Sequence, residues 1–318
     1  MSISDVFSML GGLALFLYGM RMMREHLEQA AGGKLPGMLK RLTGRPLLGF
    51  LAGTGITAVV QSSTAVMVLL IGFADAGIMN LTQAVWVILG ANIGTTVTSQ
   101  LTALNIKGIS PLFAFAGLLL LTSKKERNQR AGGILSGLGI MFIGLSMVET
   151  SMRPLGESRL FCSLLTRCGN PLTGILAGTV FTALLQSSTA SVGILQALAN
   201  NGLVDIRQSI FIVFGQNIGT CFTALLAAGG ASVNAKRTAV LHLLINLLGT
   251  VLFLLLGILL PFSDWMEHLA PGQPARQIAN VHTIFNVATS LVLLPFGGLL
   301  VKVAGMVVPE QSSWNNKK

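Results

Sequence analysis

The sequence has few charges, few aromatic residues and few cysteines. Of its 318 residues only 10% are Asp, Glu, Lys or Arg, 6% are aromatic, and three are Cys. Soluble domains carry about 25% charged residues, so this chain cannot cover a water-facing surface. The shortage of cysteine excludes a disulfide scaffold, and the shortage of charge excludes a disordered chain.

What the sequence has instead is apolar surface and glycine. Hydrophobic residues make up 52%, mean hydropathy is +0.73, and there are 37 Gly. Small residues let helices approach closely in lipid, so we predict an all-α polytopic membrane protein. The net charge of +10 is explained by basic residues in cytoplasmic loops. Neither zinc-finger spacing nor basic–aromatic interleaving occurs, so no nucleic-acid partner is predicted.

The chain contains an internal repeat at an offset of 125 residues. Gln-Ser-Ser-Thr-Ala occurs at 61–65 and again at 186–190. Gly-Ala-Asn-Ile-Gly-Thr at 90–95 is matched by Gly-Gln-Asn-Ile-Gly-Thr at 215–220. Aligned without a gap, the segments around these motifs, 44–98 and 169–223, share 25 identities in 55 positions. Such self-similarity indicates a duplicated structural unit.

The apolar runs predict membrane crossings and two interrupted segments. The predicted crossings are 6–23, 81–103, 110–123, 131–148, 208–228, 238–261 and 280–307. Two further stretches, 46–76 and 171–201, are each broken by Gln-Ser-Ser-Thr into halves of about 14 residues, too short for a bilayer about 30 Å thick. A polar break at that depth is tolerated only inside protein or beside a wet cavity. We therefore predict two re-entrant helical hairpins.

The basic residues orient these segments. With the clusters on the cytoplasmic side, and with Asp5 and the loops 149–170 and 262–279 outside, seven crossings place the N-terminus outside and the C-terminus in the cytoplasm. Asp5 precedes the first run and basic residues follow it, so we expect a mature helix rather than a cleaved signal. The clusters are Arg21, Arg24, Lys34, Lys40, Arg41 and Arg45; Lys124, Lys125, Arg127 and Arg130; Lys236 and Arg237; and Lys317 and Lys318.

Counting crossings predicts the relation between the two copies. Three crossings separate the hairpins, and an odd number inverts the second copy, so the hairpins enter from opposite faces. Inverted repeats with interrupted helices are typical of secondary transporters. The predicted units are a transport repeat over 1–125, an inverted repeat over 126–262, and a final helix with a cytoplasmic tail over 263–318.

The hairpin tips offer neutral ligands for ions. Each tip has an amide, three hydroxyls and a chain break that frees backbone groups. Helix N-termini bind anions, whereas carbonyl, hydroxyl and amide oxygens suit Na⁺. No Lys or Arg lies in either tip, so neutral donors and co-bound cations must hold an anion. We predict an anion site at Ser62, Ser63, Thr64, Ser187, Ser188 and Thr189, and Na⁺ sites at Gln61, Asn92, Thr95, Gln186, Asn217 and Thr220.

Two later segments share the pattern His-x-x-x-Asn. His242 and Asn246 lie one helical turn apart, as do His282 and Asn286. Neither pair has a third ligand at metal spacing, so no zinc site is predicted. Hydrogen bonding between helices, bracing the hairpins, is favoured over contact with substrate.

Two smaller features leave alternatives open. Asp75 follows the first hairpin where the repeat has Asn200; this difference either tunes cation binding or marks a hairpin end exposed to water. Cys162 and Cys168 share a predicted outer loop, where a disulfide is left open. Cys221 is predicted to be a packing residue.

With its paired Gln-Ser-Ser-Thr and Gly-x-Asn-Ile-Gly-Thr motifs, the chain resembles the bacterial branch of the type II sodium/phosphate cotransporter family over essentially its whole length. The resemblance implies Na⁺-coupled transport of inorganic phosphate, with phosphate between the hairpin tips and Na⁺ nearby, and no enzymatic activity or cofactor. Thr64 and Thr189 stand where many relatives have a third Ser, which preserves the hydroxyl. Some bacterial relatives continue into a cytoplasmic regulatory domain, whereas this chain ends at Lys318.

The sequence therefore predicts a secondary transporter of the bacterial inner membrane that works by alternating access. Its expected partners are phosphate, Na⁺ and membrane lipid, and a homo-oligomer is left open. A carrier of another oxyanion or of a carboxylate is the alternative within the class. An intramembrane serine hydrolase using His242 or His282 is disfavoured, because the chain lacks Gly-x-Ser-x-Gly and a nucleophile would not need duplicating. A non-transporting membrane sensor is the third alternative.

Overall fold

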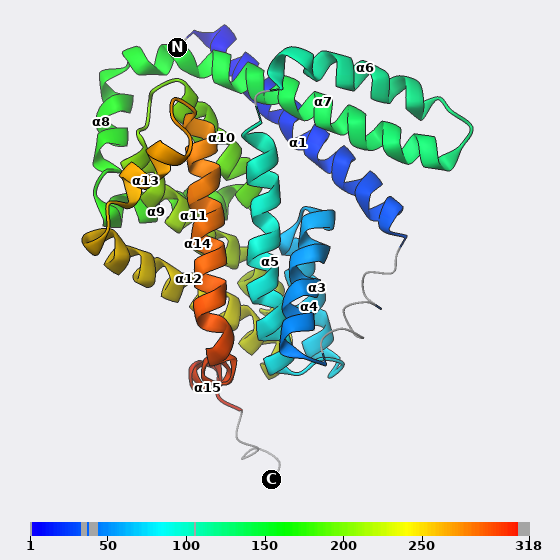
Figure 1. Ribbon diagram of the computed structural model, residues 1–318, viewed down its shortest axis with the longest axis vertical. Coiled ribbons are helices and arrows are strands. Elements are labelled where there is room, and N and C mark those ends of the chain that lie inside the picture. Colours follow the sequence, from blue (N-terminus) through cyan, green and yellow to red (C-terminus); the bar gives the residue numbers. More distant parts are fainter. Residues whose placement is uncertain (1, 33–36, 38–43, 105, 311–318) are drawn as a thin grey trace.

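A computed structural model describes residues 2–32, 37, 44–104 and 106–310 of the chain (Figure 1). Within these ranges all regular secondary structure is helical. Three short 3-10 segments are Lys107–Ile109 (η1), Arg153–Glu157 (η2) and Leu294–Phe296 (η3). The helices are α1 (Ile3–Ala31), α3 (Pro46–Val60), α4 (Ser63–Asp75), α5 (Leu81–Thr102), α6 (Ser110–Leu121), α7 (Glu126–Met152), α8 (Arg159–Arg167), α9 (Pro171–Leu185), α10 (Ser188–Asn200), α11 (Ile206–Ala227), α12 (Val233–Leu259), α13 (Phe262–Leu269), α14 (Pro274–Leu293) and α15 (Gly297–Val307).

The predicted class, an all-α polytopic membrane protein, is confirmed, but with fewer clear crossings than the seven predicted. Among the described residues, five segments are long and apolar enough to span a bilayer: α1, α7 with η2, α11, α12, and α14 with α15. A sixth is reached if α8 and α9, which meet at 110°, count as one. At 12 residues α6 is about 18 Å long, too short to span. α5 has the length, but its many Thr, Asn and Gln residues make it less apolar.

The two predicted outer loops are largely helical, which corrects the sequence interpretation. Within 149–170, α7 continues to Met152 and is followed by η2 and α8. The hydroxyl of Ser158 caps α8 by accepting a hydrogen bond from the Phe161 N–H at 3.3 Å. Within 262–279 the chain forms α13 and then begins α14 at Pro274. Both added helices are amphipathic, so their mixed sequences resembled loops.

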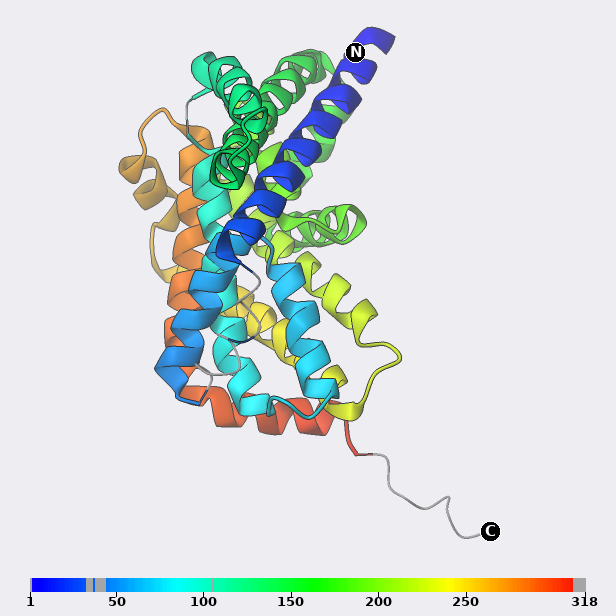
Figure 2. The ribbon, with the colours of Figure 1, turned by 90° about the vertical axis from the view of Figure 1, so that its right-hand side faces the viewer.

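The last predicted crossing, 280–307, is also interrupted. α14 ends at Leu293 and the η3 segment carries Pro295, whose ring removes a backbone donor and ends the α-helix before it. The following helix α15 lies across the end of α14 (Figure 2). Lys34, Lys40, Arg41, Lys317 and Lys318, which were used to predict the cytoplasmic side, lie outside the described residues.

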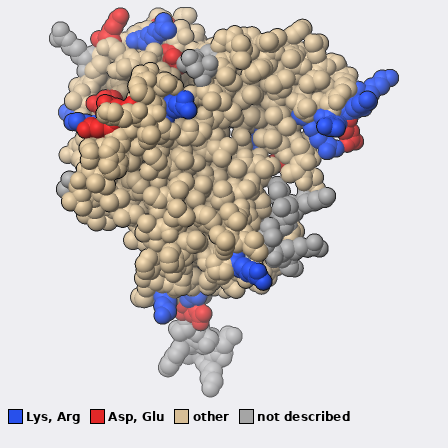
Figure 3. Space-filling model, in the orientation of Figure 1, with Lys and Arg blue, Asp and Glu red and all other residues tan. Residues whose placement is uncertain are grey.

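On the face in Figure 3, charged side chains gather near both chain ends, on the side of α8 and α13, and at the loop between α6 and α7, and a wide uncharged surface lies between them. This distribution suits a surface that contacts lipid over its middle.

The repeat recurs in the packing of two helix pairs. α3 packs on α5, and α9 packs on α11. A Cβ at Gly90 of α5 would lie 2.0 Å from the carbonyl oxygen of Phe50, and a Cβ at Gly215 of α11 would lie 2.0 Å from that of Ile175. The two contacts occupy equivalent positions of the repeat, because each residue of the second lies 125 positions after its counterpart in the first. The two helix pairs therefore pack alike.

α5 and α11 run in opposite directions along α14. α5 lies antiparallel to α14 and side by side with it (Figure 1), whereas α11 lies parallel to α14. The contacts that give these directions are Leu89–Ser290 and Ser99–His282 for α5, and Phe214–Phe285 and Asn217–Asn286 for α11.

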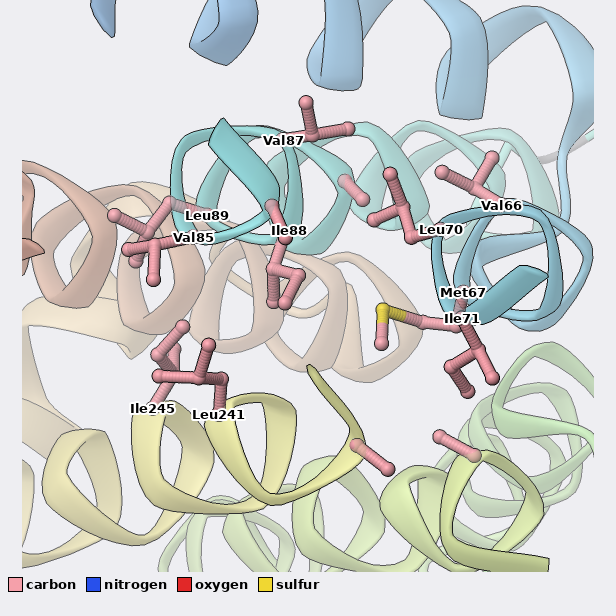
Figure 4. Close-up of a cluster of buried hydrophobic side chains, with 14 of the residues drawn as sticks. Val66, Met67, Leu70, Ile71, Val85, Val87, Ile88, Leu89, Leu241 and Ile245 are labelled. Carbon is pink, nitrogen blue, oxygen red and sulfur yellow. The ribbon is translucent and has the colours of Figure 1, made fainter. Parts of the chain in front are cut away.

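The apolar core beside α5 joins both halves of the chain. Side chains of α4, α5 and α12 interdigitate there, including Met67, Ile88 and Leu241 (Figure 4). A second cluster packs α10, α11 and α14 around Phe214 and Phe285. These clusters fix the helices that carry the polar motifs.

Candidate functional site

The break in each hairpin is made by the Gln of the Gln-Ser-Ser-Thr motif. Gln61 and Gln186 have φ of 53° and 52°, and among the described residues they are the two non-glycine residues with positive φ. This left-handed conformation is unusual for a side chain of that size. It ends α3 and α9 and turns the chain into the next helix, so the predicted helix–break–helix structure is confirmed at both tips.

The first Ser of each motif caps the helix that follows. The Ser62 hydroxyl accepts a hydrogen bond from the Ala65 N–H at 3.1 Å, and the Ser187 hydroxyl accepts one from the Ala190 N–H at 3.2 Å. Ser is a favoured N-cap because its oxygen satisfies a free N–H. The positive ends of the α4 and α10 dipoles therefore lie at the two tips.

A small cavity lies between the two halves of the molecule. It has about 10 Å³ of space for the centre of a water molecule, on the order of one site for a water or a Na⁺ ion. Side chains from both hairpins and from four long helices meet at it. They are Ser63, Asn92, Thr95, Ser188, Asn217, Thr220, His242, Asn246 and His282.

Two threonines that line this cavity donate their hydroxyl protons to their own helices. Thr95 donates its hydroxyl proton to the Ala91 carbonyl at 2.9 Å, and Thr220 donates to the Gln216 carbonyl, also at 2.9 Å. Each hydroxyl oxygen is thereby left as an acceptor. Oxygen acceptors of this kind suit a hard cation.

Two asparagine pairs tie the motif helices to the later helices. The Asn92 side-chain N–H₂ lies 3.5 Å from Oδ1 of Asn246, and the Asn286 N–H₂ donates to Oδ1 of Asn217 at 3.1 Å. Asn217 also donates to the carbonyl of Val213 at 2.8 Å. The sequence predicted that the His-x-x-x-Asn segments form hydrogen bonds between helices. Such bonds exist in both segments, and in each the Asn side chain makes one. Asn92 uses its N–H₂ group in this contact, so its side-chain carbonyl oxygen takes no part in the pairing with Asn246.

The two histidines of these segments are held differently. Nδ1 of His282 lies 2.6 Å from the hydroxyl of Ser99. Nδ1 of His242 is sealed from water-sized space and has no hydrogen-bond partner among the described residues. Both histidines line the cavity, so the sequence preference for bracing over contact with substrate stays a prediction.

The structure divides the twelve predicted site residues into two groups. Ser63, Asn92, Thr95, Ser188, Asn217 and Thr220 meet at the cavity. The other six lie at the tips but do not line it: Gln61, Ser62, Thr64, Gln186, Ser187 and Thr189. Gln61 and Gln186 form the backbone break and Ser62 and Ser187 are caps, so these four motif residues shape the tip.

A basic side chain that the sequence interpretation missed lies beside the first tip. Nη2 of Arg24, on α1, is 3.5 Å from the carbonyl oxygen of Gln61, and its Nε is buried without a partner among the described residues. The sequence prediction assigned Arg24 only to a cytoplasmic cluster. Its separation of 37 residues from the tip left no local signal of this contact.

The remaining singled-out residues lie away from the cavity. The Asp75 carboxylate accepts a hydrogen bond from the Ser232 N–H at 2.7 Å, which lowers the pKa of Asp75, and it is exposed. Asn200 donates to Oε2 of Glu149 at 3.3 Å. The exposed hairpin end is therefore the interpretation that the structure favours for both positions.

The cysteines are unpaired. Cys162 and Cys168 are both free, so the disulfide left open by the sequence is not formed in the structure. Their Sγ atoms lie near helix carbonyls instead, at 3.4 Å from Gly156 and 3.7 Å from Leu164. Cys221 is fully buried, as expected of a packing residue. Among the described residues no three His, Cys, Asp or Glu side chains gather as a metal site would require.

Comparison with known proteins gives a consistent family. A profile described as Na⁺/Pi-cotransporter matches the chain twice, over residues 15–150 and 143–261. The chain is 33% identical over 298 residues to the uncharacterized protein YqeW of Bacillus subtilis, which covers 93% of this chain and 96% of YqeW. No solved structure matches it.

Two further relatives carry functional names. The chain is 26% identical over 308 residues to the putative inorganic phosphate export protein YjbB of Salmonella typhimurium, covering 95% of this chain and 56% of YjbB. It thus spans little more than half the length of YjbB. It is also 33% identical over 114 residues to the rat sodium-dependent phosphate transport protein 2A, covering 34% of this chain and 18% of that protein.

Proposed function

The chain belongs to the Na⁺/Pi-cotransporter family, and from that premise we propose that it moves inorganic phosphate together with Na⁺ across the bacterial inner membrane by alternating access. The observation that carries the proposal is the cavity to which both hairpin tips and both Asn-Ile-Gly-Thr helices contribute side chains. A site shared by two duplicated halves is what secondary transporters use to expose one substrate to either side.

The phosphate would bind between the hairpin tips. Ser63 and Ser188 begin α4 and α10, and neither hydroxyl is hydrogen-bonded to a residue within the described ranges. Both are therefore available as donors beside two helix N-termini, which favour anions. Ser62, Thr64, Ser187 and Thr189 would contribute when the tips separate.

The Na⁺ would bind on the oxygen-rich side of the same cavity. Thr95, Thr220 and Asn92 present acceptors there, and Asn217 is the repeat counterpart of Asn92. The cavity volume is on the order of a Na⁺ ion or a water, and phosphate is several times larger. Binding of phosphate thus requires the tips to move apart, which supports a cycle of opening and closing. Gln61 and Gln186 would supply carbonyls of the tips.

The inverted repeat would provide the two access states. The opposite directions of α5 and α11 along α14 support a repeat over 126–262 that is inverted relative to 1–125. The distribution of basic residues would place the N-terminus outside and the C-terminus in the cytoplasm. A test is to place single cysteines at positions 44 and 169 in a background with Cys162 and Cys168 replaced by Ser. An impermeant thiol reagent should reach them from opposite sides, and labelling from one side would refute the inversion.

The transport itself is tested by flux. Purified protein in liposomes should take up radiolabelled phosphate under an inward Na⁺ gradient and release it when the gradient is reversed. Replacing Na⁺ by choline at equal ionic strength should abolish both fluxes, while arsenate competes better than sulfate or a dicarboxylate. Flux that ignores Na⁺ would overturn the coupling, and preference for sulfate or a carboxylate would overturn the substrate.

A further inference from the structure

Resting on the proposed function, we propose that His242 is a direct ligand of the transported anion, donating a hydrogen bond from Nε2–H into the cavity between the hairpin tips. The sequence treats His242 and His282 as equivalent, since both belong to a His-x-x-x-Asn pattern. Their surroundings separate them.

The imidazole of His242 holds no helix in place. The residue is 2% exposed on α12, and its side chain makes no hydrogen bond within the described part of the chain. The contacts at this point are made by other groups: its backbone carbonyl accepts from the Asn246 side chain at 2.9 Å and lies 3.5 Å from the thiol of Cys221. A buried polar ring without a hydrogen-bond partner is unusual. The His242 ring also lines the cavity.

The ring nitrogens of His242 differ in their surroundings. Within the described structure, Nδ1 is sealed from water-sized space without a partner. No described residue is hydrogen-bonded to Nε2 either, but Nε2 is not sealed in this way, and the cavity is the space that His242 lines. Nε2 is therefore the nitrogen that reaches whatever fills the cavity.

The orphaned Nδ1 also determines where the proton resides. A neutral imidazole has one N–H and one lone pair. Among backbone groups an orphaned buried N–H is rarer than an under-satisfied acceptor, and by the same preference we place the lone pair on Nδ1 and the proton on Nε2. Position 224, where the repeat would place a counterpart of Ser99, is Ala, so Nδ1 gains no hydroxyl there. His282 differs because Ser99 partners its Nδ1.

A hydrogen-bond donor at His242 gives the cavity one side that favours a cation and one that favours an anion. Thr95 and Thr220 present lone pairs and suit the cation, whereas Nε2–H of His242 repels a cation and attracts an anion oxygen. The cavity-lining residues include no Lys or Arg. A neutral N–H donor therefore adds to the serine hydroxyls without adding a charge that would compete with Na⁺.

The proposal is tested by separating anion binding from cation binding. His242→Met removes the donor at similar volume, and His242→Gln keeps an N–H near the position of Nε2. Calorimetry of phosphate in saturating Na⁺ should show affinity falling about 10- to 100-fold in His242→Met, as expected for one hydrogen bond to a charged group, and recovering most of that in His242→Gln. Na⁺ affinity without phosphate should stay within about twofold of wild type in both variants.

The alternative outcomes are distinct. A loss of Na⁺ affinity without phosphate would make His242 a cation ligand, and unchanged phosphate affinity would exclude it from the anion site. His282→Met serves as the matched control: it should lower the melting temperature more than His242→Met does, because only His282 loses a side-chain hydrogen bond. If wild-type protein binds no phosphate in the presence of Na⁺, the proposed function is wrong. That result is distinct from an error in the role of His242, which would appear only as unchanged phosphate affinity in His242→Met.

A second measurement needs no transport. The chain has four His, so ¹⁵N spectra of histidine-labelled protein in detergent can be assigned by comparison with His242→Gln. The His242 signals should show the neutral tautomer with the proton on Nε2. A proton on Nδ1, or a charged ring at neutral pH, would overturn the assignment.

Discussion

The two ends of the cavity are related by the repeat but are closed by different chemistry. At one end, Ser99 and Gln100 of α5 meet α10 and α14. At the other, the equivalent positions of α11, Ala224 and Leu225, pack beside α4 and α12. The repeat has the same residues at the cavity-lining positions Ser63 and Ser188, Asn92 and Asn217, and Thr95 and Thr220, while the residues around them differ.

The first end, here called the polar closure, is a hydrogen-bonded network of Ser99, Gln100, Gln196, Asn280, His282 and Thr283. Besides the contact between Ser99 and His282, the Gln196 amide donates to the carbonyls of Ser99 at 3.1 Å and Ala275 at 3.3 Å. Gln100 donates to Oδ1 of Asn280 at 3.2 Å and to the hydroxyl of Thr283 at 3.0 Å. Each of these bonds can be replaced by a bond to water.

The second end, here called the apolar closure, consists of Ile71, Ala224, Leu225 and Val240. Ile71 stands where the repeat has Gln196, and Val240 where the other His-x-x-x-Asn segment has Asn280. All four belong to the apolar core beside α5 or pack against it, and Ile71 is seen there in Figure 4. None of these side chains can exchange its contacts for water.

The difference implies that the two closures require different free energies to open, although the cavity between them is lined by duplicated residues. A protein hydrogen bond contributes about 0.5–1.5 kcal/mol net because water can replace it, whereas opening an apolar contact costs about 25 cal/mol per Å². We therefore expect the polar closure to open more readily. In the predicted orientation it faces the outside, since α5 would run outward.

The largest expected effect is a loss of stability, and it tests the close helix packing at Gly90 and Gly215 that the two halves share. Gly90→Ala and Gly215→Ala each drive a Cβ into a backbone carbonyl 2.0 Å away, so each should destabilise the protein by about 3 kcal/mol or more and to a similar extent. Fluorescence-detected size-exclusion chromatography after heating measures this. Gly55→Ala, whose Cβ would meet nothing within 4 Å, is the control. Tolerance of one substitution but not the other would break the equivalence of the helix pairs.

Exchanging residues between the closures should have the next largest effect. Ile71→Gln buries an amide in the apolar closure at a cost of about 2–4 kcal/mol. Gln196→Ile removes two hydrogen bonds to helix carbonyls, each worth about 0.5–1.5 kcal/mol net, and the Ser99 carbonyl still accepts from the Ala103 N–H at 3.2 Å. Ile71→Gln should therefore lower the melting temperature more. It should also raise the labelling of a cysteine at Ser188 by a thiol reagent from the cytoplasmic side. An unchanged labelling rate would remove the link between chemistry and access.

A single hydroxyl distinguishes the two histidines. Ser99→Ala should cost about 1–3 kcal/mol because it leaves a buried ring nitrogen of His282 unpaired. The reverse change, Ala224→Ser, should add up to about 1 kcal/mol by offering the equivalent hydroxyl to His242. Thermal unfolding of both variants and of the double exchange checks this. A stabilising Ser99→Ala would mean that the Ser99 contact is strained.

The smallest effect lies at the hairpins themselves. The Thr182 hydroxyl donates to Ser191 at 2.8 Å, whereas the Thr57 hydroxyl is buried without a partner in the described structure, because Val66 stands at the position of Ser191. Thr182→Val should cost about 1 kcal/mol. Thr57→Val should be neutral or slightly stabilising. Equal losses would indicate that Thr57 has a partner when ions are bound, which repeating the measurement in Na⁺ and phosphate would reveal.

The sequence predicted what local chemistry determines. A Gln-Ser-Ser-Thr break inside an apolar stretch predicts two short helices on either side of it, and α3 and α4, like α9 and α10, are divided there. The offset of 125 brought Ser63 and Ser188 to one cavity without knowledge of any distance. Both successes depend on residues that are close in sequence or exactly duplicated.

The sequence could not predict what tertiary packing determines. The approach of Arg24 to Gln61 depends on the angle between α1 and the first hairpin, which no local pattern encodes. The sequence predicts loops at α8 and α13 because a short amphipathic helix has no long apolar run. The inequality of His242 and His282 arises from Ser99, which lies 183 residues from its partner.

The left-handed Gln61 and Gln186 also have a mechanical consequence. A Gln is confined to a narrow well at positive φ, so each tip is a stiff elbow. Glycines with φ of 68° and 69°, Gly77 and Gly202, follow α4 and α10 at the bases of the hairpins, and glycine adopts either sign of φ without steric cost. For the proposed opening and closing we therefore expect each hairpin to tilt about its base while its tip keeps its shape.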